Sequence, residues 1–529
     1  MTYSSYLIFF GFVGVVFMLY SIIPVKHRWL VLLAASYAFY IFMNGFLTAF
    51  LLATTASVYL CGIYIGKIQD KFNIAKKELS KEEKKLLKAS VTKKKKYVVA
   101  LAVAINIGIL LFLKYFNFFA QQGNFILSWF NMNDVIPLVN FILPLGISYY
   151  TLIAIGYVVD VYRGKYKAEK NAAKLALFIS FFPQMTEGPI GRYDHLGPQL
   201  STGHKYSNEN FTAGVTLILW GFFKKLVISD RVSFIANTVF NDYQSYHGIT
   251  IVIAIMAYTL QLYTDFSGCI DMMAGCAKIF GIDFAQNFRQ PFFAKSVNEF
   301  WRRWHITLGT WFKDYVFYPV SLSSPFMKLS KNAQNHMNRF FGSLIPSAAA
   351  LLVVWLGTGL WHGAEWKYVA YGLYYYVIML FGMLFEPLFV KFFEKTHIQR
   401  EGKYFSAFRV FRTFILVNIG MALFRADTIY AFGDMISRIF YDFSFTDILN
   451  GKIFTLGTDG ADFAILVVSV IAMLIVASIK EKGCDLKTYV ANSRILVKWP
   501  VMMGLIMAII IFGAYGDNYA PVDSIYAHF

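Results

Sequence analysis

Two histidines lie in motifs that combine tryptophan, glycine and arginine within otherwise apolar stretches. His305 ends the motif EFWRRWH, and His362 stands in LWHG, about one membrane length after Phe340. An imidazole changes its charge near neutral pH, so it can accept a proton from a reacting group. Ionisable side chains inside membrane segments are costly and therefore indicate function. One such histidine is more often structural, but two in comparable surroundings favour a reaction centre.

No residues have the spacing of common metal or nucleotide sites. The four cysteines lack CxxC spacing and lie in or beside apolar segments, so we interpret them as small core residues. The sequence contains no DxDxDG loop, HExxH pair or Walker motif. We therefore expect no metal site and no nucleotide hydrolysis.

Membrane helices are the elements that must position the two histidines. Of the 529 residues, 57% are hydrophobic and 15% are charged, which leaves too much apolar surface for water-soluble cores. We expect an all-α integral membrane protein of about 11 transmembrane helices, with re-entrant and interfacial helices, in a single domain over residues 1–529. The candidate spans are residues 6–23, 29–66 (two spans, with a turn at Asn44 and Gly45), 97–119, 141–159, 211–223, 249–263, 340–360, 368–385, 411–424, 463–479 and 501–515.

A lysine-rich segment determines the predicted topology. Residues 67–96 contain twelve lysines and four acidic residues, directly after a candidate span. Basic connections stay in the cytoplasm, so we expect this segment inside and the N-terminus outside. A formal charge of +18 would also suit a nucleic-acid-binding protein. The position of the lysines instead favours a connector near anionic lipid headgroups, and we expect no nucleic-acid partner.

Two polar regions interrupt the apolar pattern. Residues 182–200 are rich in glycine, proline and polar side chains between apolar helices, which predicts a re-entrant or interfacial loop. In residues 298–315 large apolar side chains recur at spacings of three and four, so we predict one amphipathic interfacial helix. On this pattern alone, the helix would be an anchor and His305 a satisfied core histidine. The apolar face consists of Trp301, Trp304, His305, Leu308, Trp311, Phe312 and Tyr315.

Motifs over most of the chain resemble those of one family, the membrane-bound O-acyltransferases. The similar branch is that of bacterial alginate O-acetyltransferases, which includes peptidoglycan O-acetyltransferases and is related to teichoic acid D-alanyltransferases. EFWRRWH followed by WHG is the most specific part, and Cys269 departs from the tyrosine usual in this branch. The resemblance implies a ring of helices around a thinned centre with a tunnel. The motifs are PLGISYYT (144–151), VDVYR (159–163), FFP (181–183), GPIGR (188–192), YTDFSGCID (263–271), NEFWRRWHITLGTWFKDYVFYP (298–319) and LWHGAEW (360–366).

The resemblance implies that His362 is the catalytic histidine and that His305 is a second histidine of the reaction centre. A hydroxyl that attacks a thioester carbonyl must lose its proton as the new bond forms, and we assign His362 as the general base. The developing oxyanion needs a hydrogen-bond donor. His305, Trp304 and Trp361 remain alternatives for that role.

Two adjacent arginines are candidates for donor binding. Arg302 and Arg303 suit the phosphates of coenzyme A or of a carrier protein's phosphopantetheine arm. An equal alternative is that they anchor the chain at the cytoplasmic surface or form a salt bridge to Glu299.

Other polar and small residues receive supporting roles. Asp265 and Asp271 lie within an apolar run, and we interpret them as structural hydrogen-bonding or tunnel-lining residues, with Arg192 as one possible partner. Glycines near His362 could let a donor chain approach the backbone, or could serve tight helix packing. These glycines are Gly357, Gly359 and Gly363.

The leading functional hypothesis is an O-acyltransferase in a bacterial cytoplasmic membrane. It would move an acyl group, with acetyl as the first candidate, from a cytoplasmic thioester (acetyl-CoA or a phosphopantetheine thioester) to an exported polysaccharide, peptidoglycan or an extracytoplasmic esterase-like partner, with no bound cofactor. D-alanyl transfer from an acyl-carrier protein to teichoic acid is the alternative within the same chemistry. A polysaccharide or lipid transporter is the alternative from another class, which the absence of an obvious inverted repeat disfavours.

Overall fold

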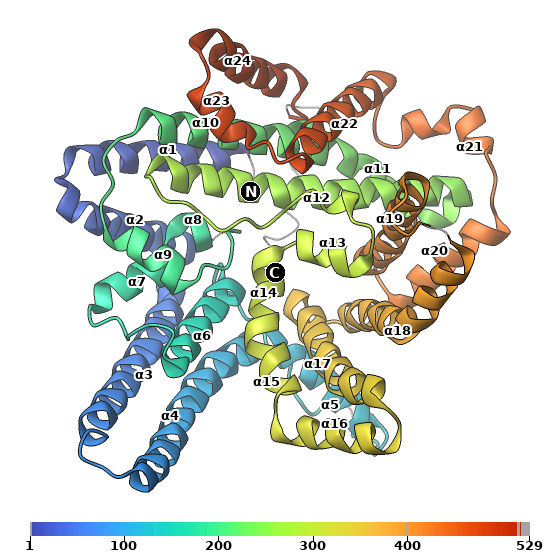
Figure 1. Ribbon diagram of the computed structural model, residues 1–529. Coiled ribbons are helices and arrows are strands. Elements are labelled where there is room, and N and C mark those ends of the chain that lie inside the picture. Colours follow the sequence, from blue (N-terminus) through green and yellow to red (C-terminus); the bar gives the residue numbers. More distant parts are fainter. Residues whose placement is uncertain (1–2, 133, 186, 398, 516–518, 520–529) are drawn as a thin grey trace. The chain divides into compact units, whose positions relative to one another are not determined.

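The computed structural model describes residues 3–132, 134–185, 187–397, 399–515 and 519, and all of the regular secondary structure in these ranges is helical (Figure 1). The predicted all-α class is therefore confirmed. The chain packs as two compact units, one built from residues 7–207 and 277–284 and the other from residues 3–6, 208–276 and the described chain from residue 285 onward. The single domain over residues 1–529 remains a prediction.

In its described residues, the first compact unit contains the α-helices from α1 to α9, except that the first residues of α1 belong to the second unit. Gly45, with a φ of +53°, separates α2 from α3 at the expected turn. The expected span at residues 141–159 is wrong at its start, because Pro144 and the left-handed Gly146 delay the helix until Ile147. The helices are α1 (Tyr3–Ile22), α2 (Arg28–Asn44), α3 (Thr48–Ala75), α4 (Lys81–Leu110), α5 (Phe116–Ser128), α6 (Ile147–Arg163), α7 (Ala172–Ser180), α8 (Phe182–Met185) and α9 (Tyr193–Ser201).

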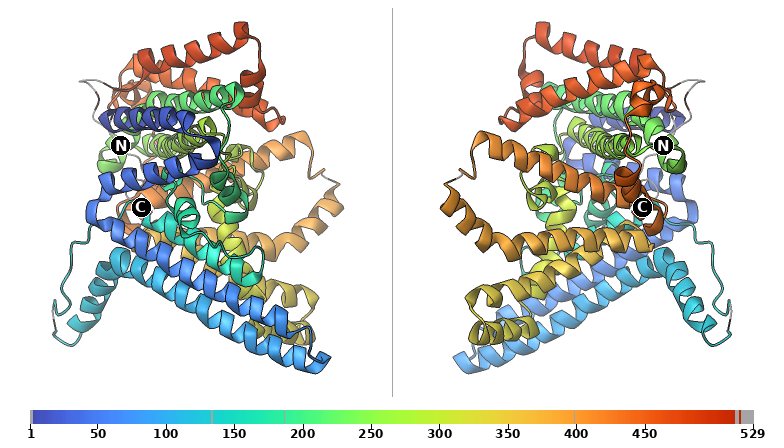
Figure 2. Two further views of the ribbon diagram at one scale, coloured as in Figure 1. Left: turned by 90° about the vertical axis from the view of Figure 1, so that its left-hand side faces the viewer. Right: turned by 90° about the vertical axis from the view of Figure 1, so that its right-hand side faces the viewer.

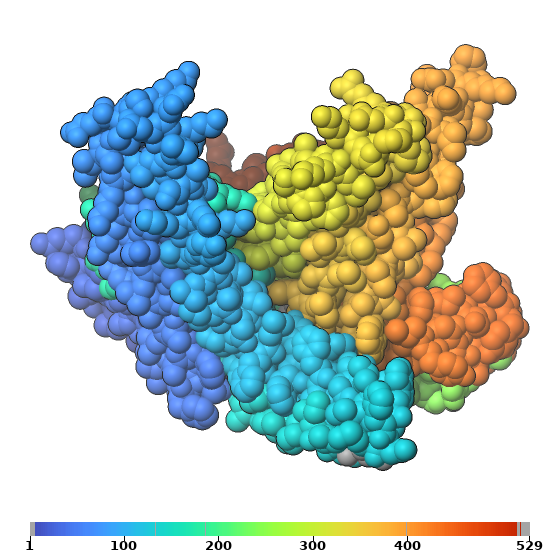
Figure 3. Space-filling model, turned by 90° about the horizontal axis from the view of Figure 1, so that it is seen from below, coloured from blue at the N-terminus to red at the C-terminus, as the bar shows by residue number. Residues whose placement is uncertain are grey.

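The lysine-rich segment is largely helical. Helices α3 and α4 run side by side (Figure 2) and form one ridge in the space-filling view (Figure 3), joined by a turn over residues 76–80. Helix α4 begins with a capping box, in which Ser80 and Glu83 satisfy each other's backbone N–H groups. The lysines thus extend from the ends of two long helices, so the segment that the sequence marks as a connector is itself largely helical.

The second compact unit contains the histidine motifs. A π-helical turn at Phe223–Ser229 joins α10 to α11, so the expected span at residues 211–223 continues well beyond its predicted end. The helices are α10 (Asn208–Phe222), α11 (Asp230–Asn241), α12 (Gly248–Ile279, whose last residues belong to the first unit), α13 (Val297–Arg303), α14 (Ile306–Phe312), α15 (Tyr318–Ser321), α16 (Ser324–His336), α17 (Arg339–His362), α18 (Trp366–Thr396), α19 (Lys403–Arg425), α20 (Ile429–Tyr441), α21 (Thr446–Leu449), α22 (Gly460–Glu481), α23 (Leu486–Asn492) and α24 (Ile495–Phe512).

Many of these helices can cross a bilayer. Within the described residues, nine helical runs are long and apolar enough, and one of them, Val25–Ala75, comprises both α2 and α3. Within α1, the apolar stretch Tyr6–Ile22 is shorter than these runs. The protein is therefore a multi-pass membrane protein. The number of about 11 spans and the ring with a tunnel remain predictions.

Candidate active site

His305 stands at a sharp corner between two short helices. Helix α13 ends at Arg303, and His305 adopts a left-handed conformation with φ 45° and ψ 50° before α14 begins at Ile306. The predicted single helix over residues 298–315 is therefore wrong. A left-handed conformation costs a non-glycine residue roughly 1 kcal/mol or more, so other contacts must hold the corner.

Asn287 supplies those contacts. Its backbone oxygen accepts a hydrogen bond from the Ile306 N–H at 2.9 Å. Its side-chain Oδ1 accepts from the backbone N–H of Thr307 at 3.1 Å and from the Thr307 hydroxyl at 2.8 Å. The same Oδ1 lies 3.3 Å from Nδ1 of His305. The segment before α13 thus replaces the helical hydrogen bonds that the chain gives up at His305.

His362 is the last residue of α17. The chain turns extended at Gly363 and re-enters a helix at Trp366, so the LWHGAEW motif interrupts the apolar run as the sequence predicts. His362 is 3% exposed, and its ring lies 5.2 Å from the ring of Phe424 and 6.0 Å from that of Tyr371, between ring centroids. Helices α17, α18 and α19 together enclose this imidazole.

One indole ring joins the two histidines. The Trp361 ring centroid lies 5.7 Å from that of His305 and 5.0 Å from that of His362. Phe266 of α12 also packs against the His305 ring, and the two ring centroids lie 4.8 Å apart. Two motifs more than 50 residues apart in sequence therefore converge on one buried aromatic cluster. This convergence is what a shared reaction centre requires.

The environment of His305 determines its charge. The side chain is 3% exposed, and burial lowers the pKa of His305 to about 3. The imidazole is therefore neutral at neutral pH, since burial in an apolar environment penalises the charged form.

The two arginines before His305 differ in their surroundings. Arg303 donates to both carboxylate oxygens of Glu481 at 2.8 and 2.9 Å, and to Glu299 at 2.7 Å. Arg302 is exposed, and its Nε donates to Asn298 one turn earlier at 3.0 Å. The salt bridge to Glu299 considered from the sequence is present for Arg303. Arg302 is the member of the pair whose guanidinium faces solvent.

The candidate indoles also differ in position. Trp304 is buried, stacks on Phe300 with ring centroids 5.4 Å apart, and packs against Tyr263, Phe288 and Phe292. Trp361, in contrast, contacts both histidine rings. Of the two indoles considered for the oxyanion, Trp361 is therefore the one that lies next to both histidines.

Buried lysines accompany the two aspartates of α12. Lys225 lies 2.7 Å from Asp265 and 2.9 Å from Asp230, while Lys224 lies 2.7 Å from Asp271, each measured from Nζ to a carboxylate oxygen. Both lysines belong to the π-helical turn, an irregularity that is frequent at functional sites. Sequence reasoning missed these lysines, although the pair KK inside GFFKKLVIS was a visible signal.

The aspartates therefore have charged partners within their own compact unit. Phe266, the residue after Asp265, is the ring that packs on His305. The ion pairs thus fix the stretch of α12 that supports the histidine. Arg192, the partner considered from the sequence, belongs to the other compact unit, where it precedes α9.

The glycines near His362 mediate helix packing. A Cβ on Gly359 would overlap the carbonyl oxygen of Tyr368, and a Cβ on Gly363 would overlap the Tyr368 ring. A Cβ on Gly357 would lie 3.0 Å from Phe312. Of the two interpretations drawn from the sequence, these contacts favour close packing of α17 on its neighbours.

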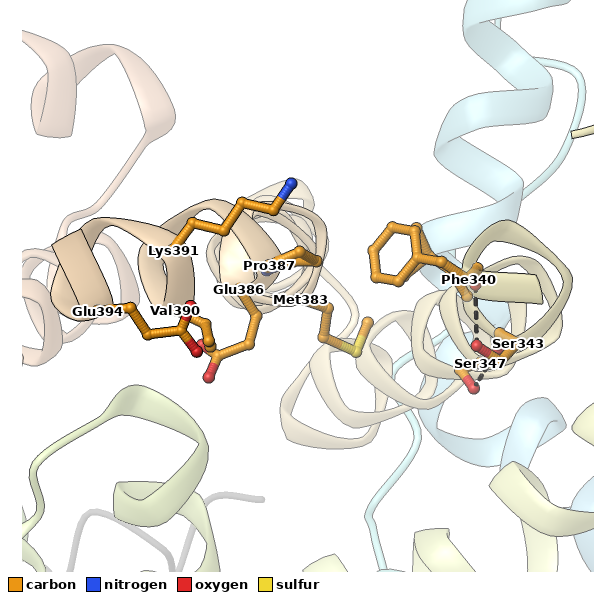
Figure 4. A pocket seen from close by; sticks show the side chains of 10 residues that line it. Phe340, Ser343, Ser347, Met383, Glu386, Pro387, Val390, Lys391 and Glu394 are labelled. Atoms are coloured by element: carbon orange, nitrogen blue, oxygen red, sulfur yellow. Dashed lines mark hydrogen bonds between the residues drawn. The ribbon is translucent and has the colours of Figure 1, made fainter. Parts of the chain in front are cut away.

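A surface groove lies at the other end of the α17–α18 hairpin. Figure 4 shows Phe340, Ser343 and Ser347 of α17 opposite side chains of α18 that include Met383 and Glu386. His362 follows Ser347 by fifteen residues, or about 22 Å along a helix that rises 1.5 Å per residue. The groove is therefore separate from the histidine cluster. Among the described residues, no group of three or more His, Cys, Asp or Glu side chains is placed to hold a metal ion.

Comparisons with known proteins agree with the motifs. The membrane-bound O-acyltransferase family matches residues 169–424. The chain is 30% identical to a probable alginate O-acetylase, AlgI, of Pseudomonas syringae pv. tomato, over 89% of this chain and 80% of that protein. It is 33% identical to the peptidoglycan O-acetyltransferase of Helicobacter pylori, over 53% and 54% of the two chains. It is 31% identical to the teichoic acid D-alanyltransferase of Bacillus subtilis, over 47% and 60%.

Proposed function

The chain belongs to the membrane-bound O-acyltransferase family and is an O-acyltransferase, and we propose that it transfers acetyl groups to a polymer of the bacterial cell surface. The donor in this proposal is a thioester on the cytoplasmic side of the inner membrane. The acceptor is an exported polysaccharide, peptidoglycan or an extracytoplasmic partner that passes the acetyl group on. The transporter alternative loses its basis because the family is one of acyltransferases.

The convergence of both histidines on Trp361 carries the proposal. In the reaction, His362 accepts the proton of the acceptor hydroxyl while the hydroxyl oxygen forms a bond to the thioester carbonyl carbon. The Trp361 indole N–H donates to the resulting oxyanion. When the tetrahedral intermediate collapses, the carbon–sulfur bond breaks and the sulfur takes the proton from His362. The products are the O-acyl ester and the free thiol.

Donor binding is assigned to the exposed arginine. Arg302 offers a guanidinium that its contact with Asn298 leaves accessible, and a guanidinium fits phosphate oxygens in a bidentate manner. Arg303 is assigned to structure, because its donors are directed at Glu299 and Glu481. This division replaces the joint role that the sequence suggested for the two arginines.

D-alanyl transfer remains the second candidate function. The similarity to the teichoic acid D-alanyltransferase of Bacillus subtilis favours it, although this match covers 47% of the chain, compared with 89% for the alginate O-acetylase. Both reactions need the same base and the same oxyanion donor. Assays with radiolabelled acetyl-CoA and with a D-alanyl carrier protein as donors distinguish them.

The test of the proposal is substitution of His362. We expect His362→Ala, purified in nanodiscs, to lose about 100- to 10,000-fold in acyl transfer while retaining donor binding, because general base catalysis contributes that factor. His336→Ala is the matched control, since His336 lies exposed at the end of α16. Substantial transfer by folded His362→Ala would refute the assignment of the base.

A further inference from the structure

We infer that Asn287 is a positioning residue that holds His305 in the tautomer with its proton on Nδ1, so that Nε2 carries the lone pair. The inference rests on the proposed function only in placing His305 within an acyl-transfer site. The tautomer itself follows from the hydrogen bonds that Asn287 Oδ1 makes with His305 and with the Thr307 N–H. It changes the role that His305 can play in the reaction.

The backbone N–H of Thr307 fixes the orientation of the Asn287 side-chain amide. A backbone N–H can only donate, and the N–H of Thr307 lies 3.1 Å from the Asn287 side-chain atom that faces it. That atom must therefore be the carbonyl oxygen Oδ1. The Thr307 hydroxyl, 2.8 Å from the same atom, fits this orientation as a second donor. The usual ambiguity between the oxygen and nitrogen of an amide is thus removed.

The tautomer of His305 follows from that orientation. Nδ1 of His305 lies 3.3 Å from the same Oδ1, and a carbonyl oxygen can only accept a hydrogen bond. Nδ1 must therefore carry the hydrogen. A neutral imidazole has one proton, so Nε2 is left unprotonated. Burial keeps the ring neutral, because it lowers the pKa of His305 to about 3.

The arrangement is rigid around Asn287 as well as around the ring. Asn287 is 1% exposed, and its backbone oxygen accepts from Ile306 at 2.9 Å. Two residues further, the N–H of Arg289 donates to the backbone oxygen of Arg303 at 2.9 Å. These two bonds join residues 287 and 289 to residues 306 and 303, which lie on either side of His305 in the chain. Ring contacts with Phe266 and Trp361 restrict rotation of the imidazole.

The chemical consequence concerns the oxyanion. Nε2 with a lone pair accepts a hydrogen bond from a hydroxyl or a thiol, but it cannot donate one to a developing negative charge. His305 is therefore removed from the three oxyanion donors considered from the sequence. Stabilisation of the oxyanion falls to N–H groups such as that of Trp361.

The Asn287→Leu variant tests the positioning role. Leucine has a similar branched shape but no acceptor, so His305 loses the bond that selects its tautomer and the corner loses two further bonds. We expect acyl transfer to fall about 100-fold, the scale of a misplaced catalytic group, with donor binding unchanged. Thr307→Val is the matched control for stability, because it removes one bond to Oδ1 and leaves the Thr307 N–H and the His305 contact in place.

The decisive measurement is spectroscopic and does not depend on activity. In protein labelled with ¹⁵N-histidine in nanodiscs, the ring signals that disappear in His305→Gln belong to His305. At pH 7 we expect Nδ1 in the protonated range and Nε2 in the unprotonated range, with this preference lost in Asn287→Leu. The opposite tautomer, or an unchanged preference in Asn287→Leu, would overturn the inference. Transfer that survives His362→Ala would instead refute the proposed function and leave the tautomer intact.

Discussion

The contact between α17 and α18 offers a sharp test of how the fold positions His362. A Cβ on Gly372 would overlap the carbonyl oxygen of Trp355 and lie 3.0 Å from its carbonyl carbon. Backbone atoms cannot rotate away as a side chain can. We therefore expect Gly372→Ala to force α18 away from α17 near Gly359, which faces Gly372 across the same contact.

The expected magnitude follows from two opposing effects. Overpacking a close contact costs about 1–3 kcal/mol, whereas replacing glycine by alanine within a helix contributes about 1 kcal/mol of stability. The net loss of stability is therefore about 0–2 kcal/mol. The effect on catalysis should be larger, because His362 ends α17 and Tyr371 on α18 packs on its ring. A displacement of about 1 Å costs about 100-fold in rate.

The assay compares Gly372→Ala with Gly382→Ala on the same helix. A Cβ on Gly382 has nothing within 4 Å, so this control receives the gain in helix propensity without the overlap. Thermal denaturation and acyl transfer are measured for both variants in nanodiscs. We expect Gly382→Ala to match the parent protein in activity. If Gly372→Ala were as active and as stable as Gly382→Ala, the close contact would not be what positions His362.

Three further predictions concern charge. Arg303→Gln should lower stability by about 1–2 kcal/mol, since Glu299 and Glu481, both partly exposed, lose their guanidinium partner. Arg302→Gln should mainly weaken donor binding. Calorimetry and donor titration separate the two effects, and the reverse pattern would exclude our division of roles. His305 takes up a proton below pH 6.5 in the unfolded chain but only below about 3 in the folded one. Stability should thus fall by about 2 kcal/mol from pH 7 to pH 5, and unfolding titrations of His305→Gln should lack this loss. A cysteine at Lys85 should react with an impermeant maleimide only after permeabilisation; labelling of intact cells would reverse the topology.

The sequence by itself determined the class of the protein and the identity of its family. An apolar composition with basic connections can only be satisfied by lipid-facing helices, because every backbone group in a bilayer must be hydrogen-bonded internally. The turn at Asn44 and Gly45 and the helix break after His362 were also predictable. Both depend on local signals, namely glycine and polar residues within a few positions. The family motifs identified His305 and His362, but their roles remain predictions.

Tertiary structure alone decided the geometry around His305. The spacing of aromatic residues predicted one helix through it, but Asn287, eighteen residues earlier, withdraws the Thr307 N–H from a helical partner. Spacing along the chain also could not distinguish Arg302 from Arg303, because Glu481 lies 178 residues away from its partner. Local patterns report which face a residue prefers. Which side chain satisfies a buried polar group depends on segments that only folding brings together.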